Sequence, residues 1–138
     1  MTAYRLFDHT ADLGIEALGG TIEELYAGAA MALFDLLTDA ETIRVTKVRT
    51  IAVEGEDPAD LLVNFLRELL AAWNSTGFLV RDCTISELTP RRLTALLEGE
   101  LCDPARHRIK KEIKAVTYHQ SSVRRTAKGW VGRVVVDV

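Results

Sequence analysis

The chain has 138 residues, a formal net charge of −3 and 27% charged residues, a balance typical of one globular domain. A net negative charge argues against a protein that grips nucleic acid mainly by neutralising phosphates. No apolar run approaches the roughly 20 residues of a membrane span, and the N-terminus lacks a signal peptide's basic and apolar regions. We therefore expect a single domain over residues 1–138 of a soluble, cytoplasmic protein with no membrane partner.

The pattern of apolar residues predicts seven strands and two helices. In chain order these are strands at 4–9 and 13–18, a helix at 22–37, a strand at 44–53, a helix at 58–73, and strands at 78–88, 92–102, 112–123 and 130–138. Thr21 and Glu24 form a capping box before the first helix, and Asp57 precedes Pro58 at the start of the second. This order predicts an α+β fold, a mixed β-sheet covered by two α-helices.

Common catalytic motifs are missing from the sequence. Gly19-Gly20 matches neither of the usual phosphate-loop spacings, and there is no Gly-x-Ser-x-Gly elbow. Cys83 and Cys102 fit no metal spacing and no disulfide framework, so we expect two reduced thiols in strands.

An acidic cluster separates the first two predicted strands. Asp8, His9 and Asp12 lie within five residues of one another. Burying one unpaired charge costs several kcal/mol, so such a cluster needs solvent, a basic partner or a bound cation.

A second pair of acids ends the chain. The last predicted strand brings the side chain of Asp137 close to the α-carboxylate of Val138. Two anions 4 Å apart repel by roughly 4 kcal/mol at an effective dielectric of about 20, and a hard divalent cation would turn that repulsion into binding. A frayed, solvated tail is the alternative.

Two basic features have a functional and a simpler interpretation. Lys114 shares a strand face with Val116 and Tyr118, where it either extends from a sheet edge into water or serves a polar site. A polar loop carries four further cations that could contact phosphate or an acidic protein surface, or only water. They are Arg106, Arg108, Lys110 and Lys111.

Several segments together resemble one family, the archeases. They are Asp8-His9-Thr10-Ala11-Asp12-Leu13-Gly14-Ile15, Gly20-Thr21-Ile22-Glu23-Glu24-Leu25, Leu61-Leu62-Val63-Asn64-Phe65-Leu66-Arg67-Glu68-Leu69-Leu70, Gly99-Glu100, Ile113-Lys114-Ala115-Val116-Thr117-Tyr118-His119, and the C-terminal residues from Trp130. The resemblance covers nearly the whole chain, in order and at similar spacing.

The resemblance implies that the protein is an accessory factor and not an enzyme. Archeases activate the GTP-dependent tRNA-splicing RNA ligase, which joins RNA 3′-phosphate and 5′-hydroxyl ends. They promote guanylylation and multiple turnover of that ligase, so the implied partner is the ligase protein, and RNA is contacted only indirectly. The implied fold is a mixed sheet covered by two helices, loosely similar to a chaperone domain.

The resemblance also implies a set of site residues. A divalent metal, Ca²⁺ or Mg²⁺, would be held by Asp12, Asp137 and Val138, and Asp8 and Lys114 match other functionally important positions. Some family members have an acidic residue where this chain has Gly20, so no role of that acid carries over.

Two other functions remain open at this point. One is a chaperone-like module that binds RNA-modifying proteins without metal chemistry. The other is a metal-dependent phosphoester hydrolase, for which the sequence offers carboxylates but no evident nucleophile or general base.

Overall fold

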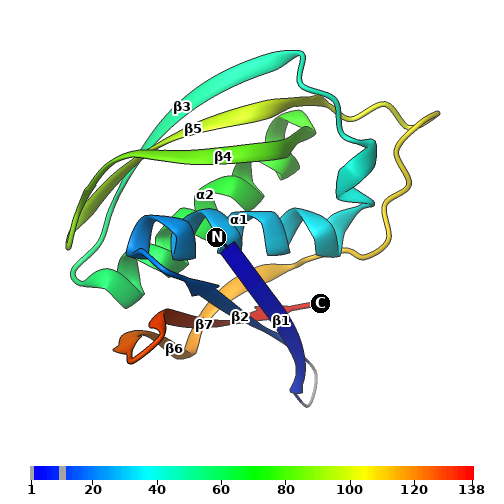
Figure 1. The fold of residues 1–138 in the computed structure, drawn as a ribbon. Helices are drawn as coiled ribbons and strands as arrows, with labels where there is room; N and C mark the ends of the chain where they lie inside the picture. The colour runs from blue at the N-terminus through cyan, green and yellow to red at the C-terminus, as the bar shows by residue number, and fades with distance from the viewer. Residues whose placement is uncertain (1, 10–11) are drawn as a thin grey trace.

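The structure, a computed structural model, describes the backbone of residues 2–9 and 12–138 and the side chains of residues 3–6 and 12–138. Its elements (Figure 1) are β1 (Thr2–His9), β2 (Asp12–Gly19), α1 (Ile22–Leu37), the 3₁₀ helix η1 (Ala40–Thr42), β3 (Lys47–Glu54), α2 (Pro58–Thr76), β4 (Phe78–Thr89), β5 (Arg92–Leu101), β6 (Ala115–Thr126) and β7 (Gly129–Asp137). Among these residues no helix is long and apolar enough to cross a membrane.

The strands form two antiparallel sheets with both helices between them (Figure 1). The four-stranded sheet has the order β1-β2-β7-β6, and the three-stranded sheet has the order β3-β5-β4. The predicted α+β class is confirmed, although the sequence indicated one mixed sheet and the strands divide into two. The reason lies in α1, which buries residues around most of its circumference and so needs cover on two sides.

The core fills the space between the two sheets. The helices supply its largest side chains, with Tyr26 and Phe65 packed edge to face at 6.4 Å between ring centroids. Gly132 of β7 lies directly beneath them: a Cβ there would come within 2.9 Å of the Leu25 side chain and 3.1 Å of Leu62. The helices therefore cover only the inner face of the four-stranded sheet.

The last strand of the chain lies beside the second. β7 lies between β2 and β6 and pairs antiparallel with both, so the C-terminal end of β7 lies beside the start of β2. β1 is the outer neighbour of β2 and is fastened to α1 by a hydrogen bond from the Tyr4 hydroxyl to the Asp35 carboxylate. Burial and this carboxylate together raise the pKa of Tyr4 to about 12.

The loop before β6 is longer than predicted. The strand expected at 112–123 begins only at Ala115, because the preceding residues run along the end of α1. There the Thr38 hydroxyl donates to the Arg108 carbonyl at 2.6 Å, and the Lys110 amide donates to the Leu37 carbonyl at 2.8 Å. Lys114 therefore precedes β6 and is not part of it.

Both cysteines are free thiols, as predicted. Cys83 lies in β4, where burial raises the pKa of its thiol to about 12. Cys102 follows the last residue of β5 instead of lying within a strand.

Candidate metal centre

The structure brings Asp12 and Asp137 together although 124 residues separate them in sequence. Asp12 is the first residue of β2 and Asp137 the last of β7, and the two are direct partners in the antiparallel register. Directly opposite residues project to the same face of a sheet, with Cβ atoms about 4.5–5.5 Å apart. Both residues are partly exposed, so the pair is accessible from solvent.

The two carboxylates lie on the face of the sheet that points away from the helices. Side chains alternate between faces along a strand. On β2, Ile15 and Ala17 are buried against the helices, which assigns Asp12 to the opposite, outer face. The same alternation from the buried Val134 and Val136 assigns Asp137 to the outer face.

Lys114 lies next to this pair through its backbone. Its amide donates to the Asp137 carbonyl at 2.8 Å, and the following residue, Ala115, is the register partner of Asp137. The Lys114 side chain is exposed. Three of the predicted site residues, Asp12, Lys114 and Asp137, therefore meet at one end of the four-stranded sheet.

The other two predicted residues are described less completely. Val138 follows Asp137 directly and is partly buried against the core. The backbone of Asp8 is paired with Leu13 of β2, but its side chain lies outside the described residues.

The donor set fits a hard divalent cation. Ca²⁺ and Mg²⁺ take oxygen ligands, and the pair Asp12–Asp137 supplies two carboxylates from opposing strands. In the part of the chain that the structure describes, no three His, Cys, Asp or Glu side chains cluster as a metal site. The predicted set has only two such side chains there, and its third ligand is a main-chain carboxylate.

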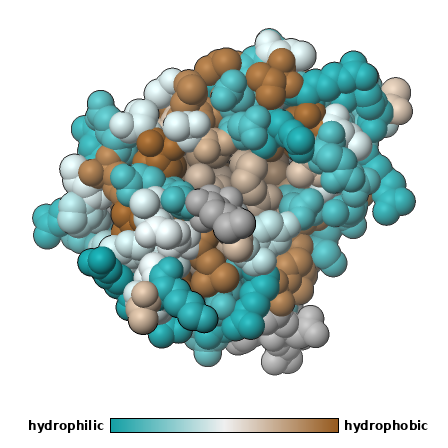
Figure 2. All heavy atoms as spheres, viewed as in Figure 1, coloured by the Kyte–Doolittle hydropathy of each residue, from teal (hydrophilic) through white to brown (hydrophobic). Residues whose placement is uncertain are grey.

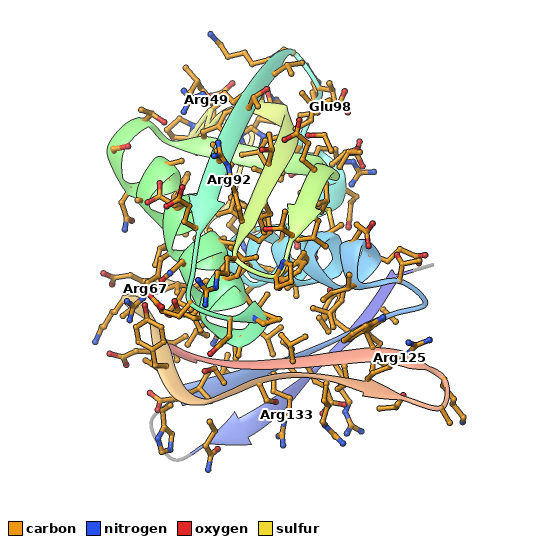
Figure 3. All side chains as sticks on the ribbon, turned by 90° about the vertical axis from the view of Figure 1, so that its left-hand side faces the viewer. Arg49, Arg67, Arg92, Glu98, Arg125 and Arg133 are labelled. Atoms are coloured by element: carbon orange, nitrogen blue, oxygen red, sulfur yellow. The ribbon has the colours of Figure 1, made fainter. Side chains whose placement is uncertain are left out.

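A clamp from α2 holds β6 beside the site, and the sequence analysis did not find it. Arg67 donates from Nε to the Val116 carbonyl at 2.9 Å, and its guanidinium lies 4.1 Å from the centre of the Tyr118 ring (Figure 3). The Tyr118 hydroxyl in turn donates to Asn64 Oδ1 at 2.6 Å. The segments that carry the family resemblance include all three residues, Asn64, Arg67 and Tyr118. The contact between them becomes visible only in the packing of α2 on β6.

The fold and this site define an α+β protein with two helices between two antiparallel sheets and an acidic pair where the end of β7 meets the start of β2. Residues 4–138 match the model of the Archease protein family (MTH1598/TM1083). The chain belongs to the archease family, as the sequence predicted.

Individual relatives agree with this assignment. The chain is 37% identical over 142 residues to a protein archease of Pyrococcus abyssi, and the match covers 100% of both chains. It is also 37% identical to a protein archease of Methanopyrus kandleri, with 95% of this chain and 96% of that protein covered.

Two solved structures have a similar fold. The solution structure of Methanobacterium thermoautotrophicum protein 1598 is 29% identical, with a TM-score of 0.82 and 98% of each chain covered. A crystal structure from Thermotoga maritima, described as an archease and possible chaperone, has a TM-score of 0.64 at 22% identity and covers 96% of this chain and 94% of that one. The second likeness concerns the fold alone.

Proposed function

We propose that this protein activates a GTP-dependent tRNA-splicing RNA ligase in the cytoplasm and is not itself an enzyme. It promotes guanylylation of the ligase and multiple turnover. The observation that supports this most is the register of Asp12 against Asp137 at an open end of the sheet, in a chain of the archease family.

In this proposal Asp12, Asp137 and the α-carboxylate of Val138 hold one divalent cation, Ca²⁺ or Mg²⁺. Hard oxygen ligands of this kind leave positions that water or a partner's oxygen can fill. When bound, the cation supplies positive charge for phosphate or carboxylate oxygens of the ligase and its nucleotide. The two aspartates would hold it at the partly exposed end of the sheet where β2 begins and β7 ends.

The remaining site residues contact the partner. Lys114 is exposed beside the acidic pair and donates hydrogen bonds to a nucleotide phosphate or an acidic group of the ligase. In this proposal Asp8 supplies a further acidic contact to the ligase. By binding one ligase conformation more tightly than the other, these residues favour the conformation competent for guanylylation.

The test is a ligation assay with the cognate ligase, in which Asp12→Asn and Asp137→Asn are compared with the wild type. Each substitution removes a charged ligand, so we expect calorimetry to show metal binding weakened at least about tenfold. Stimulation of multiple turnover should fall in parallel. Adding one alanine after Val138 moves the α-carboxylate and should have the same effect.

The matched control is Asp82→Asn, which removes an exposed acid from β4 in the other sheet and should leave both measurements unchanged. If Asp12→Asn and Asp137→Asn stimulate the ligase like the wild type, the metal-centred proposal is wrong. Phosphoester turnover by the isolated protein would support a hydrolase instead.

A metal-independent chaperone-like module is the second candidate, because large apolar side chains are exposed on the surface. It predicts that ligase stimulation survives chelation. Several large apolar side chains are at least 40% exposed: Leu6, Val45, Val48, Leu101, Ile109 and Tyr118. On the face shown in Figure 2 apolar residues form separate patches among hydrophilic ones.

A further inference from the structure

A row of three charged residues crosses the four-stranded sheet. Arg5 of β1, Glu16 of β2 and Arg133 of β7 are successive register partners. Arg5 Nε lies 2.8 Å from Glu16 Oε1, and Arg133 Nε lies 3.5 Å from Glu16 Oε2. One carboxylate therefore stands between two guanidinium groups, with each oxygen facing one of them.

This row lies on the same outer face as the acidic pair. Glu16 lies between Ile15 and Ala17, both of which are buried against the helices, so its side chain projects the other way. Figure 3 shows Arg133 on the side of the sheet away from the helices. Glu16 is only 8% exposed there, while the side chains of Arg5 and Arg133 are 72% and 41% exposed.

The row has more positive than negative charge. Two arginines against one glutamate give it a local charge of +1, in a chain whose net charge is −3. Both arginines form ion pairs with Glu16 through Nε, but the contact of Arg133 at 3.5 Å is not a hydrogen bond, so the carboxylate attracts both guanidinium groups without fixing the plane of Arg133. A guanidinium can bind phosphate through two parallel hydrogen bonds.

The row also has a fixed position relative to the acidic pair. Glu16 is four residues along β2 from Asp12, and Arg133 is four residues along β7 from Asp137. At about 3.3 Å per residue the two rows are about 13 Å apart on one face. The acidic pair and the row of charged residues therefore lie close enough to contact one ligand or partner on the same outer face.

We propose that Arg5 and Arg133 bind a phosphate group, such as that of an RNA strand presented beside the acidic pair. Glu16 attracts the two arginines to the same place by ion pairing and lowers the affinity for phosphate by its own charge. The inference rests on the proposed function for the identity of the phosphate, and it replaces an indirect RNA contact by a direct one.

The deciding variant is Glu16→Gln, because a phosphate site and a purely structural ion row predict different results. Removing the carboxylate's charge raises the charge of the row from +1 to +2, and at an effective dielectric between 40 and 80 this should tighten phosphate binding roughly threefold. A row that only stabilises the sheet would lose thermal stability and leave phosphate binding unchanged.

Binding is measured by fluorescence anisotropy on the full chain, in EDTA and again in Mg²⁺, with a fluorescein-labelled ten-nucleotide RNA that ends in a 3′-phosphate. Arg5→Gln and Arg133→Gln should each weaken binding roughly fivefold and lower the slope of log affinity against log salt by about one. Competition with GTP and with the same RNA lacking its 3′-phosphate tells whether the phosphate comes from a nucleotide, an RNA end or the RNA backbone, and each of these supports a phosphate site.

Matched controls lie on the outer face of the three-stranded sheet. Arg92→Gln and Glu98→Gln make the same changes of net charge on β5 (Figure 3), and neither should alter RNA affinity beyond twofold. A thermal melt of every variant verifies folding, and Arg5→Lys, which keeps the charge, should retain part of the affinity.

The inference is overturned if the wild type binds none of the probes, or if Glu16→Gln and Glu98→Gln have equal effects. These outcomes are separate from those of the ligase assay. RNA binding without ligase stimulation would contradict the proposed function alone, and stimulation without RNA binding would contradict the phosphate site alone.

Discussion

Glu100 near the end of β5 is a buried carboxylate surrounded by hydrogen-bond donors. The guanidinium of Arg106 contacts both of its oxygens, and the amide of Arg44 donates to Oε2 at 2.5 Å. His107 Nδ1 accepts from the Asp103 amide at 2.8 Å, so the ring proton is on Nε2, which donates to Glu100 at 3.0 Å. Arg106, one of the four cations of the polar loop, is therefore a structural residue.

Because of these donors, the stability of the fold depends on pH in a predictable direction. The hydrogen bond from Arg106, with those from Arg44 and His107, outweighs the effect of burial and lowers the pKa of Glu100 from 4.5 to about 2. A carboxyl group whose pKa is lower in the folded chain stabilises the fold above its unfolded value. That stabilisation is lost as the pH falls from about 4.5 toward 2.

We expect Glu100→Gln to lower the melting temperature at pH 7 by several degrees, because Arg106 loses its charged acceptor. Between pH 4.5 and 2 the difference from the wild type should shrink, since the wild-type carboxylate becomes protonated there. Melting curves by circular dichroism from pH 7 to pH 2 check this, with Glu98→Gln as the control on the same strand. If the melting temperatures of wild type and Glu100→Gln differed by the same amount at every pH, the lowered pKa of Glu100 would be contradicted.

At the scale of single residues, the sequence predicts which groups need a partner but not which partner they find. That Asp12 and Asp137 share a site was implied by the family resemblance alone, and the register places the two residues opposite each other. The row of Arg5, Glu16 and Arg133 was missed, because an arginine, a glutamate and an arginine far apart in sequence show no pattern until the register is known.

Local sequence signals predict the bounds of the helices closely, as α2 shows. The Asp57 carboxylate accepts from the Asp60 amide at 2.9 Å, with Pro58 as the first helical residue. At the other end Gly77 has φ 72° and donates its amide to the Trp73 carbonyl at 2.8 Å, so the helix runs to Thr76 instead of the predicted residue 73.

Gly77→Ala should destabilise the protein by about 1 kcal/mol, because an alanine in the left-handed region is strained. The nearest atom to an added Cβ is the Cβ of Cys102 at 3.7 Å, so no steric clash adds to this strain. Urea denaturation measures the change. Gly20→Ala is the control: its nearest neighbour is Glu24 Oε1, also at 3.7 Å, its φ is not positive, and it should stay within about 0.5 kcal/mol. Equal losses of stability in Gly77→Ala and Gly20→Ala would contradict the role of Gly77 as the C-cap of α2.

Strand bounds are predicted less well than helix bounds, because pairing decides them. β3 begins at Lys47, three residues later than predicted, where its register with Gly99 begins. β6 breaks register between Thr117 and Ser122, with Gln120 at φ 56°. The sequence does not predict this break in register, since glutamine rarely adopts positive φ.

At the scale of the whole molecule, the two helices join the sheets into one unit. α1 contacts β4 of one sheet and β2 of the other, and α2 contacts β3 and β6 in the same way. The division into two sheets was not predictable, because the sequence of a strand does not show which strand it pairs with, and only long-range pairing separates the two sheets. A core shared in this way predicts that neither sheet unfolds without the other.

The two tryptophans allow this to be tested, since Trp73 lies in α2 and Trp130 in β7. In the single-tryptophan variants Trp73→Phe and Trp130→Phe, urea denaturation followed by fluorescence should give coincident transitions. Adding Leu97→Ala, a fully buried position in β5, should lower the free energy of unfolding by about 2–5 kcal/mol. Both probes should report the same loss, although Trp130 is in the other sheet.

Val48→Ala is the matched control, because it shortens an apolar side chain in the same three-stranded sheet at a position that is 59% exposed. Its effect should stay within about 0.5 kcal/mol. If Leu97→Ala shifted the transition seen by Trp73 and left that seen by Trp130 in place, the sheets would unfold separately. The acidic pair and the arginine row, both on the four-stranded sheet, would then keep their geometry without the rest of the fold. Coincident shifts instead mean that the site depends on core residues in a sheet it never touches.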